Sequence, residues 1–229
     1  MEIILDVDRN YYQNLSELYE EVKRQRGALA LQEQTKEKKK EVKEPEKEAG
    51  WFSRFRWGFT DSGFLFVGGK DSKQNEEIIK MMEDKDLLFH ADYWGGSMVL
   101  LKNGIEAGER DRAEAGDIAA SFCKAWKDGV PFVDVFYITK RQIGKEGMKA
   151  GQIQIFGKRE WLRKVKLGYK IVCKEGWGCL AGKESSRKGA VVIQGESTAQ
   201  KIKEKIQERL GCFVQAKQLP EKGRVVFEF

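Results

Sequence analysis

The chain has little of what membrane proteins, secreted proteins and metal-binding domains need. None of its apolar runs approaches the roughly 20 residues of a membrane-spanning helix. The N-terminus, from Met1 to Asp6, lacks the positive start and the apolar core of a secretory signal peptide. There are four cysteines, and the six-residue spacing of Cys173 and Cys179 is not that of a zinc site. We therefore expect a cytoplasmic protein with free thiols and no bound metal.

Histidine is nearly absent as well, which limits the catalytic sites that the chain can build. Its one histidine, His90, would have to serve any Ser-His-Asp or Cys-His site. No dinucleotide-binding glycine motif, zinc-protease motif or EF-hand occurs. The segment Val67–Ser72 departs from a P-loop, because Lys70 is followed by Asp rather than by Ser or Thr. We expect no enzymatic activity and no cofactor.

Two short patterns leave alternatives open. His90 and Asp92 would project from the same face of a strand, where they form a structural pair, an RNA contact or a catalytic pair. Gly68 and Gly69, followed by Lys70 and a predicted helix, either present backbone N–H groups to a nucleic-acid phosphate or form a plain tight turn.

Positive charge is concentrated in one part of the chain. The net charge is +6, but residues 138–188 alone hold 14 basic and 4 acidic side chains, whereas residues 51–137 carry a net charge of −4. Such asymmetry favours a polyanionic partner. The alternative is a solvated, lysine-rich surface without a partner.

A basic loop is the strongest chemical feature. Strands predicted over Val133–Ile138 and Gln152–Phe156 bracket a run of basic residues that begins at Lys140, so these charges are expected on a loop that contacts phosphates. Trp161 and Tyr169 are expected either to stack on unpaired bases or to pack in the core. The RNA-binding residues that we predict are Lys140, Arg141, Lys145, Lys158 and Arg159, with Lys70 and His90 as further candidates.

The periodicity predicts mixed strands and helices in the middle of the chain, which is an α+β fold. We expect strands over Gly63–Val67, Leu87–Ala91, Met98–Lys102 and Phe132–Ile138. Asp71 or Ser72 is expected to cap a helix that runs to about Met82. A second helix is expected from Ala113 to Lys127, because apolar side chains share one side of it and Gly129 follows its end.

The two ends of the chain differ from its middle. A strand over residues 1–8 and a helix with an apolar stripe from Tyr11 to Leu29 are predicted, and together with the charged residues up to 50 they make a short, coiled-coil-like arm. The C-terminal part, residues 172–229, is expected to be a small β-α-β-β extension. Its helix is predicted to end at Gly211, before a hairpin formed by Cys212–Leu219 and Arg224–Phe229.

The block from Trp51 to Ile171 resembles the NFACT-R domain, the C-terminal module of the RqcH/NEMF family of ribosome quality-control factors. The order and spacing of several short segments carry this resemblance. They are Trp51–Trp57, Ser62–Asp71, Gln74–Glu76, His90–Asp92, Glu114–Gly116 and Phe156–Arg159. The resemblance implies a mixed β-sheet with packed helices over residues 51–171, preceded by the arm at residues 1–50.

The resemblance also implies partners. Members of this family bind large ribosomal subunits with obstructed nascent chains and recruit tRNA. We therefore expect binding to large-subunit rRNA, to tRNA or to both. The family's NFACT-N domain is missing from this sequence, which predicts a separate chain that supplies it. The family pattern His-Ala-Asp-x-His-Gly is also altered, since Trp94 replaces the second histidine after His90, Ala91 and Asp92.

Two other functions remain open from the residues themselves. One is a standalone RNA-binding protein linked to tRNA modification or processing, in which His90 and Asp92 take part in chemistry. The other is a protein–protein scaffold, in which the apolar stripe from Tyr11 to Leu29 docks a partner helix.

Overall fold

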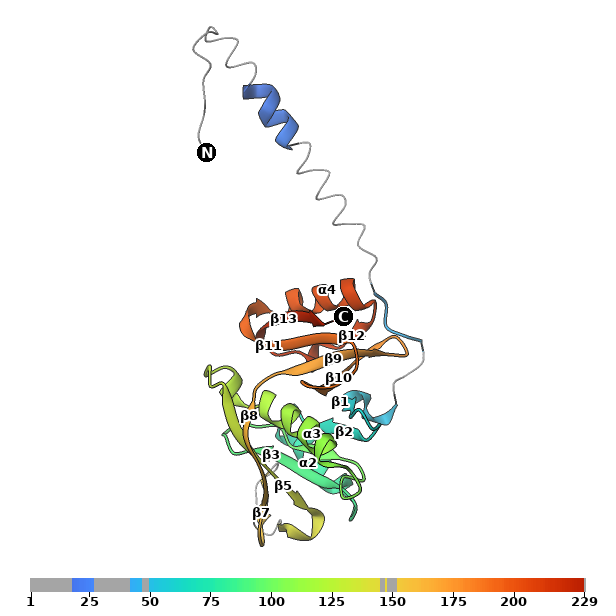
Figure 1. Cartoon of the computed structure of the whole chain (residues 1–229), viewed down its shortest axis with the longest axis vertical. Coiled ribbons are helices and arrows are strands. Elements are labelled where there is room, and N and C mark those ends of the chain that lie inside the picture. The colour runs from blue at the N-terminus through green and yellow to red at the C-terminus, as the bar shows by residue number, and fades with distance from the viewer. Residues whose placement is uncertain (1–17, 27–41, 47–49, 145–146, 148–151, 229) are drawn as a thin grey trace. The chain divides into compact units, whose positions relative to one another are not determined.

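The computed structural model describes residues 18–26, 42–46, 50–144, 147 and 152–228. By contacts the chain separates into two units, Met1–Glu41 and Val42–Phe229. In the first unit, residues 18–26 are helical, as the apolar stripe predicts (Figure 1). The strand predicted over residues 1–8 and the remainder of the stripe lie outside the described residues.

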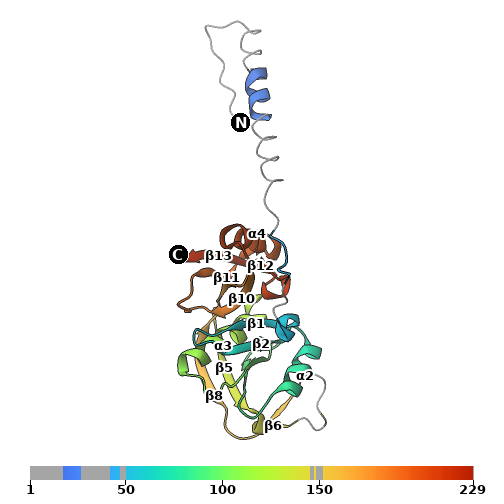
Figure 2. The same cartoon turned by 90° about the vertical axis from the view of Figure 1, so that its right-hand side faces the viewer.

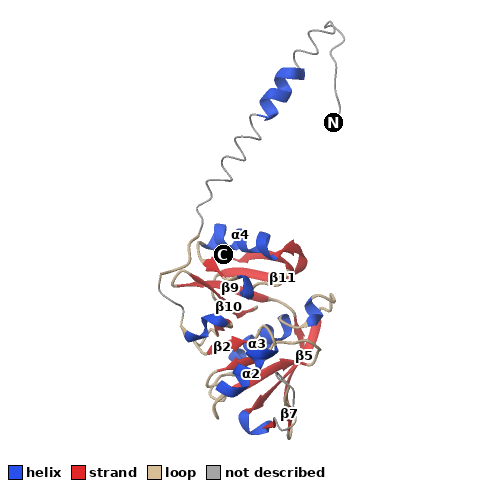
Figure 3. Ribbon diagram, turned by 180° about the vertical axis from the view of Figure 1, so that it is seen from behind, coloured by secondary structure: helices blue, strands red, loops and turns tan. Residues whose placement is uncertain are grey.

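The second unit is built on one large mixed sheet with helices packed against it, which confirms the α+β fold (Figure 3). The sheet has 11 strands, in the order β13-β11-β9-β10-β1-β2-β4-β3-β5-β8, with β12 paired to β10. In chain order these strands are β1 (Arg56–Phe59), β2 (Leu65–Gly68), β3 (Leu87–Ala91), β4 (Val99–Leu101), β5 (Phe132–Thr139), β8 (Glu160–Lys166), β9 (Tyr169–Lys174), β10 (Trp177–Gly182), β11 (Gly189–Thr198), β12 (Phe213–Val214) and β13 (Lys222–Glu228).

A second, two-stranded sheet joins β6 (Ile143–Gly144) to β7 (Gln154–Ile155). Short 3-10 turns cover Trp51–Arg54, Lys124–Trp126, Lys140–Gln142 and Ala216–Gln218. In the part of the chain that is described, no helix has both the length and the apolar content to cross a membrane.

The three helices of the second unit begin and end where local chemistry directs them. Helix α2 (Ser72–Met81) starts at Asp71, whose carboxylate accepts the Gln74 N–H at 2.9 Å. Helix α4 (Ala199–Leu210) starts at Thr198 and ends at Gly211, which adopts the left-handed conformation with φ of 68°. Helix α3 (Glu109–Ser121) begins and ends earlier than predicted, because the chain leaves the helix after Ser121 and forms the 3-10 turn Lys124–Trp126.

Alternate strand residues build two apolar cores, one on each face of the sheet. Phe66 and Phe89 pack in the core that includes Ile118 of α3 and Ile202 of α4. Their chain neighbours Val67 and Leu88 pack in the other core with Ile78 and Ile79 of α2. This period of two is the expected consequence of a strand that is buried on both faces. Figure 2 shows α4 at the β11–β13 end of the unit, with α2 and α3 along the remainder.

The C-terminal extension corrects one prediction. The predicted hairpin between Cys212–Leu219 and Arg224–Phe229 is wrong, because β12 pairs in parallel with β10, and β13 pairs with β11. Neither strand pairs with the other across the turn that connects them. Their backbone N–H and C=O groups are satisfied instead by β10 and β11.

The division predicted between residues 171 and 172 stays a prediction, but that point lies inside β9. Strand β10 pairs with β1 through Gly58 and Leu180. The sheet therefore runs without interruption from the NFACT-R-like block into the C-terminal extension.

Candidate nucleic-acid interface

Two of the predicted basic clusters meet at one end of the sheet. Lys140 and Arg141 lie exposed on the 3-10 turn that follows β5, and Lys158 is exposed just before β8. The Gln142 side chain holds the two clusters together. Its Oε1 accepts the Thr139 N–H at 2.9 Å, and its Nε2 donates to the Lys158 carbonyl oxygen at 2.5 Å. The Phe156 N–H also donates to the Gln142 carbonyl oxygen, at 2.8 Å.

The remaining charges of this region have different surroundings. The Arg159 guanidinium lies over the ring of Phe136, 4.8 Å from its centroid, in a cation–π contact. Lys158 pairs with Glu160 at 3.7 Å on the exposed surface, an arrangement that stabilises little. Arg163, by contrast, is bonded to Asp134 at 2.6 Å. We call the exposed residues Lys140, Arg141 and Lys158, together with the half-buried Arg159, the basic face. Lys145, also predicted for this site, lies outside the described residues.

The aromatic side chains proposed for base stacking here have other roles. Tyr169 is fully buried, and its hydroxyl donates to the Gln218 carbonyl oxygen at 2.8 Å, so it belongs to the core. Trp161 is half-buried between the Phe136 ring and the Arg163 guanidinium, whose distances from its ring centroid are 5.6 and 4.2 Å.

The glycine pair before Lys70 does not offer free N–H groups to a phosphate. The Gly69 N–H donates to the Met98 carbonyl oxygen at 3.1 Å, and the Lys70 N–H donates to Gln74 Oε1 at 3.2 Å. A Cβ at Gly69 would lie 2.2 Å from Asn75 Oδ1, so glycine is required there for close packing. Of this predicted phosphate cradle, the exposed Lys70 side chain remains available.

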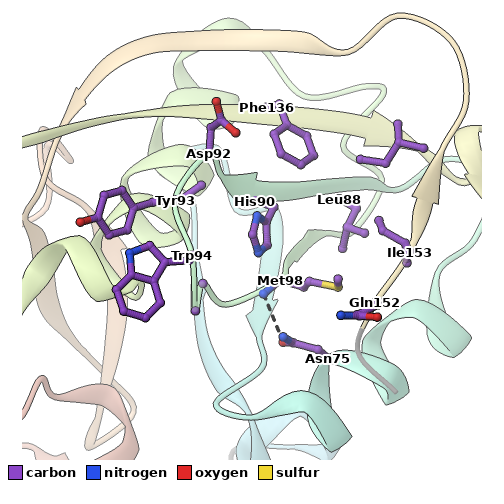
Figure 4. Close-up of a pocket in the computed structure, with 14 residues that line it drawn as sticks. Asn75, Leu88, His90, Asp92, Tyr93, Trp94, Met98, Phe136, Gln152 and Ile153 are labelled. Atoms are coloured by element: carbon purple, nitrogen blue, oxygen red, sulfur yellow. Dashed lines mark hydrogen bonds between the residues drawn. The ribbon is translucent and has the colours of Figure 1, made fainter. Parts of the chain in front are cut away.

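His90 lines a cavity of about 790 Å³ beside the turn that follows β3. In Figure 4 the imidazole points into the cavity, and the Asp92 carboxylate points away from it. Burial lowers the pKa of His90, and hydrogen bonds from the imidazole to the backbone of Ala91 and Gly96 and the negative charge of Asp92 oppose this only in part. The imidazole is therefore neutral at pH 7.

Other lining residues of this cavity were not predicted as site residues. Its walls are apolar on one side, where Leu88, Met98 and Ile153 lie, and aromatic at its mouth, where Tyr93 and Trp94 lie (Figure 4). The Trp94 side chain is 61% exposed. The only sequence signal for it is its place in the altered family pattern, before two glycines.

The cysteines are free thiols, as expected. Cys173 is exposed, whereas Cys123, Cys179 and Cys212 are buried. Burial raises the pKa of Cys179 to about 11, so its thiol is protonated and unreactive at neutral pH. Among the described residues, no cluster of three or more His, Cys, Asp or Glu side chains is placed to hold a metal ion.

Part of the chain that holds these residues matches a known protein family. Residues 52–157 match the family model described as the NFACT protein RNA binding domain. These residues form an NFACT-R domain. The match spans β1 to β7, and so includes the cavity at His90 and two of the four residues of the basic face, Lys140 and Arg141.

Relatives of the NFACT-R domain and its flanking residues come from archaea and animals. The chain is 34% identical over 139 residues to the archaeal Rqc2 homolog aRqcH of Methanocaldococcus jannaschii, a match that covers 57% of this chain and 21% of that protein. It is 34% identical over 120 residues to the ribosome quality control complex subunit NEMF homolog of Drosophila melanogaster, covering 49% and 12%. It is 29% identical over 156 residues to human NEMF, covering 64% and 14%. The chain thus spans about a fifth or less of these relatives.

A solved structure is also similar. It is the C-terminal part of the fibronectin/fibrinogen-binding protein from Streptococcus suis, with 25% identity and a TM-score of 0.45, covering 54% of this chain and 49% of that one.

Proposed function

We propose that this chain binds structured RNA, of the large ribosomal subunit, of tRNA or of both, in ribosome quality control. The observation that supports this most directly is the basic face. Gln142 joins the turn that carries Lys140 and Arg141 to the segment that carries Lys158. The turn lies within the residues that match the RNA-binding family, and Lys158 follows directly after them. Phosphates are bound by such clustered, exposed cations, with release of counterions. The relatives named for ribosome quality control suggest the setting.

We propose a binding role without catalysis. The one histidine of the chain is neutral and turned into a cavity, and the carboxylate two residues later points away from it. A general acid–base pair needs its partners within hydrogen-bond reach of the same reacting atom. The alternative role in RNA modification, and a separate chain that supplies an NFACT-N domain, stay predictions.

The basic face is tested by removing two of its charges. We expect Lys140→Ala/Arg141→Ala to weaken binding to tRNA and to large ribosomal subunits. We also expect it to lower the slope of log affinity against log salt by about 1 to 2, because each phosphate contact contributes roughly 0.7 to 0.9. Fluorescence anisotropy with labelled tRNA across a salt series measures the slope, and sedimentation measures subunit binding.

The matched control removes two exposed lysines of α4, as Lys201→Ala/Lys205→Ala. This variant loses the same net charge at another place, so it separates local contact from overall charge. Equal salt slopes for wild type and for the Lys140→Ala/Arg141→Ala variant would refute the assignment.

A further inference from the structure

We propose that the cavity at His90 receives one unpaired nucleobase of an RNA strand, and that an adjoining groove at Lys70 and Lys124 holds the strand's phosphates. This inference rests on the proposed RNA binding, and it assigns a ligand to a site apart from the basic face. The basic face serves phosphates of folded RNA, whereas this site reads a single base.

The cavity has the properties of a base-binding pocket. Its volume, about 790 Å³, lies in the range of small-molecule sites, and Leu88, Met98 and Ile153 give it an apolar wall. The neutral His90 imidazole hydrogen-bonds to the backbone through its N–H, and its other nitrogen can accept a hydrogen bond from the edge of a base. In Figure 4 the Gln152 amide lies across the cavity from His90 and adds further donor and acceptor groups.

Trp94 at the mouth is a stacking platform. Its indole is 61% exposed, although it is one of the largest apolar side chains of the chain. Lys124 Nζ lies 3.6 Å from the Trp94 ring centroid, and the Tyr93 ring is inclined to the indole by only 29° at a centroid distance of 6.3 Å. Tyr93 is fixed in turn, because its hydroxyl donates to Asp128 at 2.9 Å. Because the Lys124 ammonium lies over one face of this exposed indole, an unpaired base would stack on the other face.

A cationic groove of about 860 Å³ continues from the cavity. Two of its lysines are neutralised, since Lys127 pairs with Glu221 at 2.8 Å and Lys222 pairs with Glu196 at 3.2 Å. For Lys70 and Lys124 the described part of the chain provides no carboxylate within ion-pair distance. These two ammonium groups are therefore the ones available to phosphate oxygens.

A lip of two glycines separates the cavity from the groove, and both sites are lined by it. Gly95 has φ of 66°, a backbone conformation in which a residue with a side chain would be strained. A Cβ at Gly96 would lie 3.1 Å from His90 Nε2. With no side chain on the lip, a nucleotide crosses it with its base on the His90 side and its phosphate on the Lys124 side.

The test compares single-stranded oligonucleotides on two tryptophan variants. We expect Trp94→Ala to weaken binding of a single-stranded RNA hexamer by roughly tenfold, because stacking of one base on an aromatic ring has about this effect. Trp51→Ala is the matched control, since Trp51 is 53% exposed and also lies in the NFACT-R block; it should bind like wild type. Equal affinities of the two variants would overturn the base pocket.

A hexamer with abasic sites keeps the phosphates and removes the bases. The affinity of wild-type protein for this abasic hexamer should be about as low as the affinity of Trp94→Ala for the intact hexamer. Equal affinities of wild-type protein for the intact and the abasic hexamer would overturn the proposal. Lys70→Gln should lower the salt slope for the hexamer by about 0.7, the contribution of one phosphate in single strands. An unchanged salt slope would refute the contact between Lys70 in the groove and a phosphate of the strand.

Each of the two proposals can be refuted without refuting the other. Should Lys140→Ala/Arg141→Ala leave tRNA binding unchanged while Trp94→Ala weakens hexamer binding, the basic face is refuted and the base pocket stands. The opposite result refutes the base pocket and keeps the basic face.

Discussion

Asp61 shows how much of this fold depends on a single carboxylate. Its oxygens accept from Ser185 Oγ at 2.5 Å, from the Ser186 N–H at 2.8 Å and from Arg187 Nε at 3.2 Å, and Arg110 donates to it at 3.0 Å. Burial acts to raise the pKa of Asp61, but the hydrogen bonds from Ser185 and Ser186 and the Arg187 charge outweigh it and lower the pKa to about 2. The ionised side chain thus links the NFACT-R domain to the loop between β10 and β11.

Replacing this carboxylate is expected to destabilise the fold in a pH-dependent way. Asp61→Asn should lower the free energy of unfolding by about 2 to 3 kcal/mol at pH 7, because charged hydrogen bonds are lost. A lowered pKa in the folded state adds stability above the ordinary pKa of Asp, and that stability is lost as the pH falls toward about 2. The difference between wild type and variant should therefore shrink from pH 4 to pH 2. Urea unfolding at several pH values measures it.

The exposed Asp84 provides the control for this measurement. Asp84→Asn removes the same charge and should change stability by less than about 0.5 kcal/mol. A constant difference between Asp61→Asn and wild type over the acid range would contradict the role of ionised Asp61.

At the scale of elements, the pairing of β1 with β10 joins the two parts of the sheet. These strands run in parallel, with Gly58 opposite Leu180. A Cβ at Gly58 would lie 1.9 Å from the Leu180 carbonyl oxygen and 2.7 Å from the Phe66 ring. The strands approach so closely only because this residue has no side chain.

A single methyl group is therefore expected to strain this junction. Gly58→Ala should destabilise the protein by about 1 to 3 kcal/mol or more, the usual effect of overpacking. Chemical denaturation gives the free energy, and amide hydrogen exchange in β1 and β10 should accelerate more than in β3. Gly108→Ala is the control, because its nearest atom would be 3.5 Å away and its φ is −72°, so it should have little effect. Equal stabilities of the two variants would refute the close approach.

On the scale of the whole molecule, the C-terminal extension completes the core of the NFACT-R domain. Ile202 and Ile206 of α4 belong to the same buried cluster as Phe89 and Ile118. The Trp126 indole N–H donates to the Lys222 carbonyl oxygen at 2.8 Å, and Gln218 Nε2 donates to the Trp57 carbonyl oxygen at 3.2 Å. The extension thus supplies both apolar cover and hydrogen bonds.

Truncation tests this dependence. A chain that ends at Ile171 is expected to lose cooperative unfolding and to bind hydrophobic dyes, because β1 loses one of its two partners, β10, and apolar surface is uncovered. A chain that begins at Val42 should unfold with the midpoint of the full chain, since residues 1–41 form their own unit. Thermal unfolding by circular dichroism compares the two. A cooperative transition at the wild-type temperature for the chain that ends at Ile171 would show an independent domain.

Much of the candidate site follows from composition, and part of it does not. The concentration of lysine and arginine in residues 138–188 predicts the basic face without any contact being known. The approach of Lys158 to Lys140 depends on the hydrogen bond from Gln142, which joins residues 16 positions apart. The cavity at His90 was not predicted, because its wall comes from α2, β3, β5 and β7. No local sequence pattern indicates that these elements meet.

Several local elements of this protein can be predicted from neighbouring residues alone. The cap at Asp71 and the helix end at Gly211 act between near neighbours, so they are visible in the chain. The pairing of β12 with β10 and of β13 with β11, and the place of Trp94 at a cavity, could be learned only from the three-dimensional structure. The physical reason is that long-range pairing is settled by competition among strand edges and buried surfaces across the whole molecule.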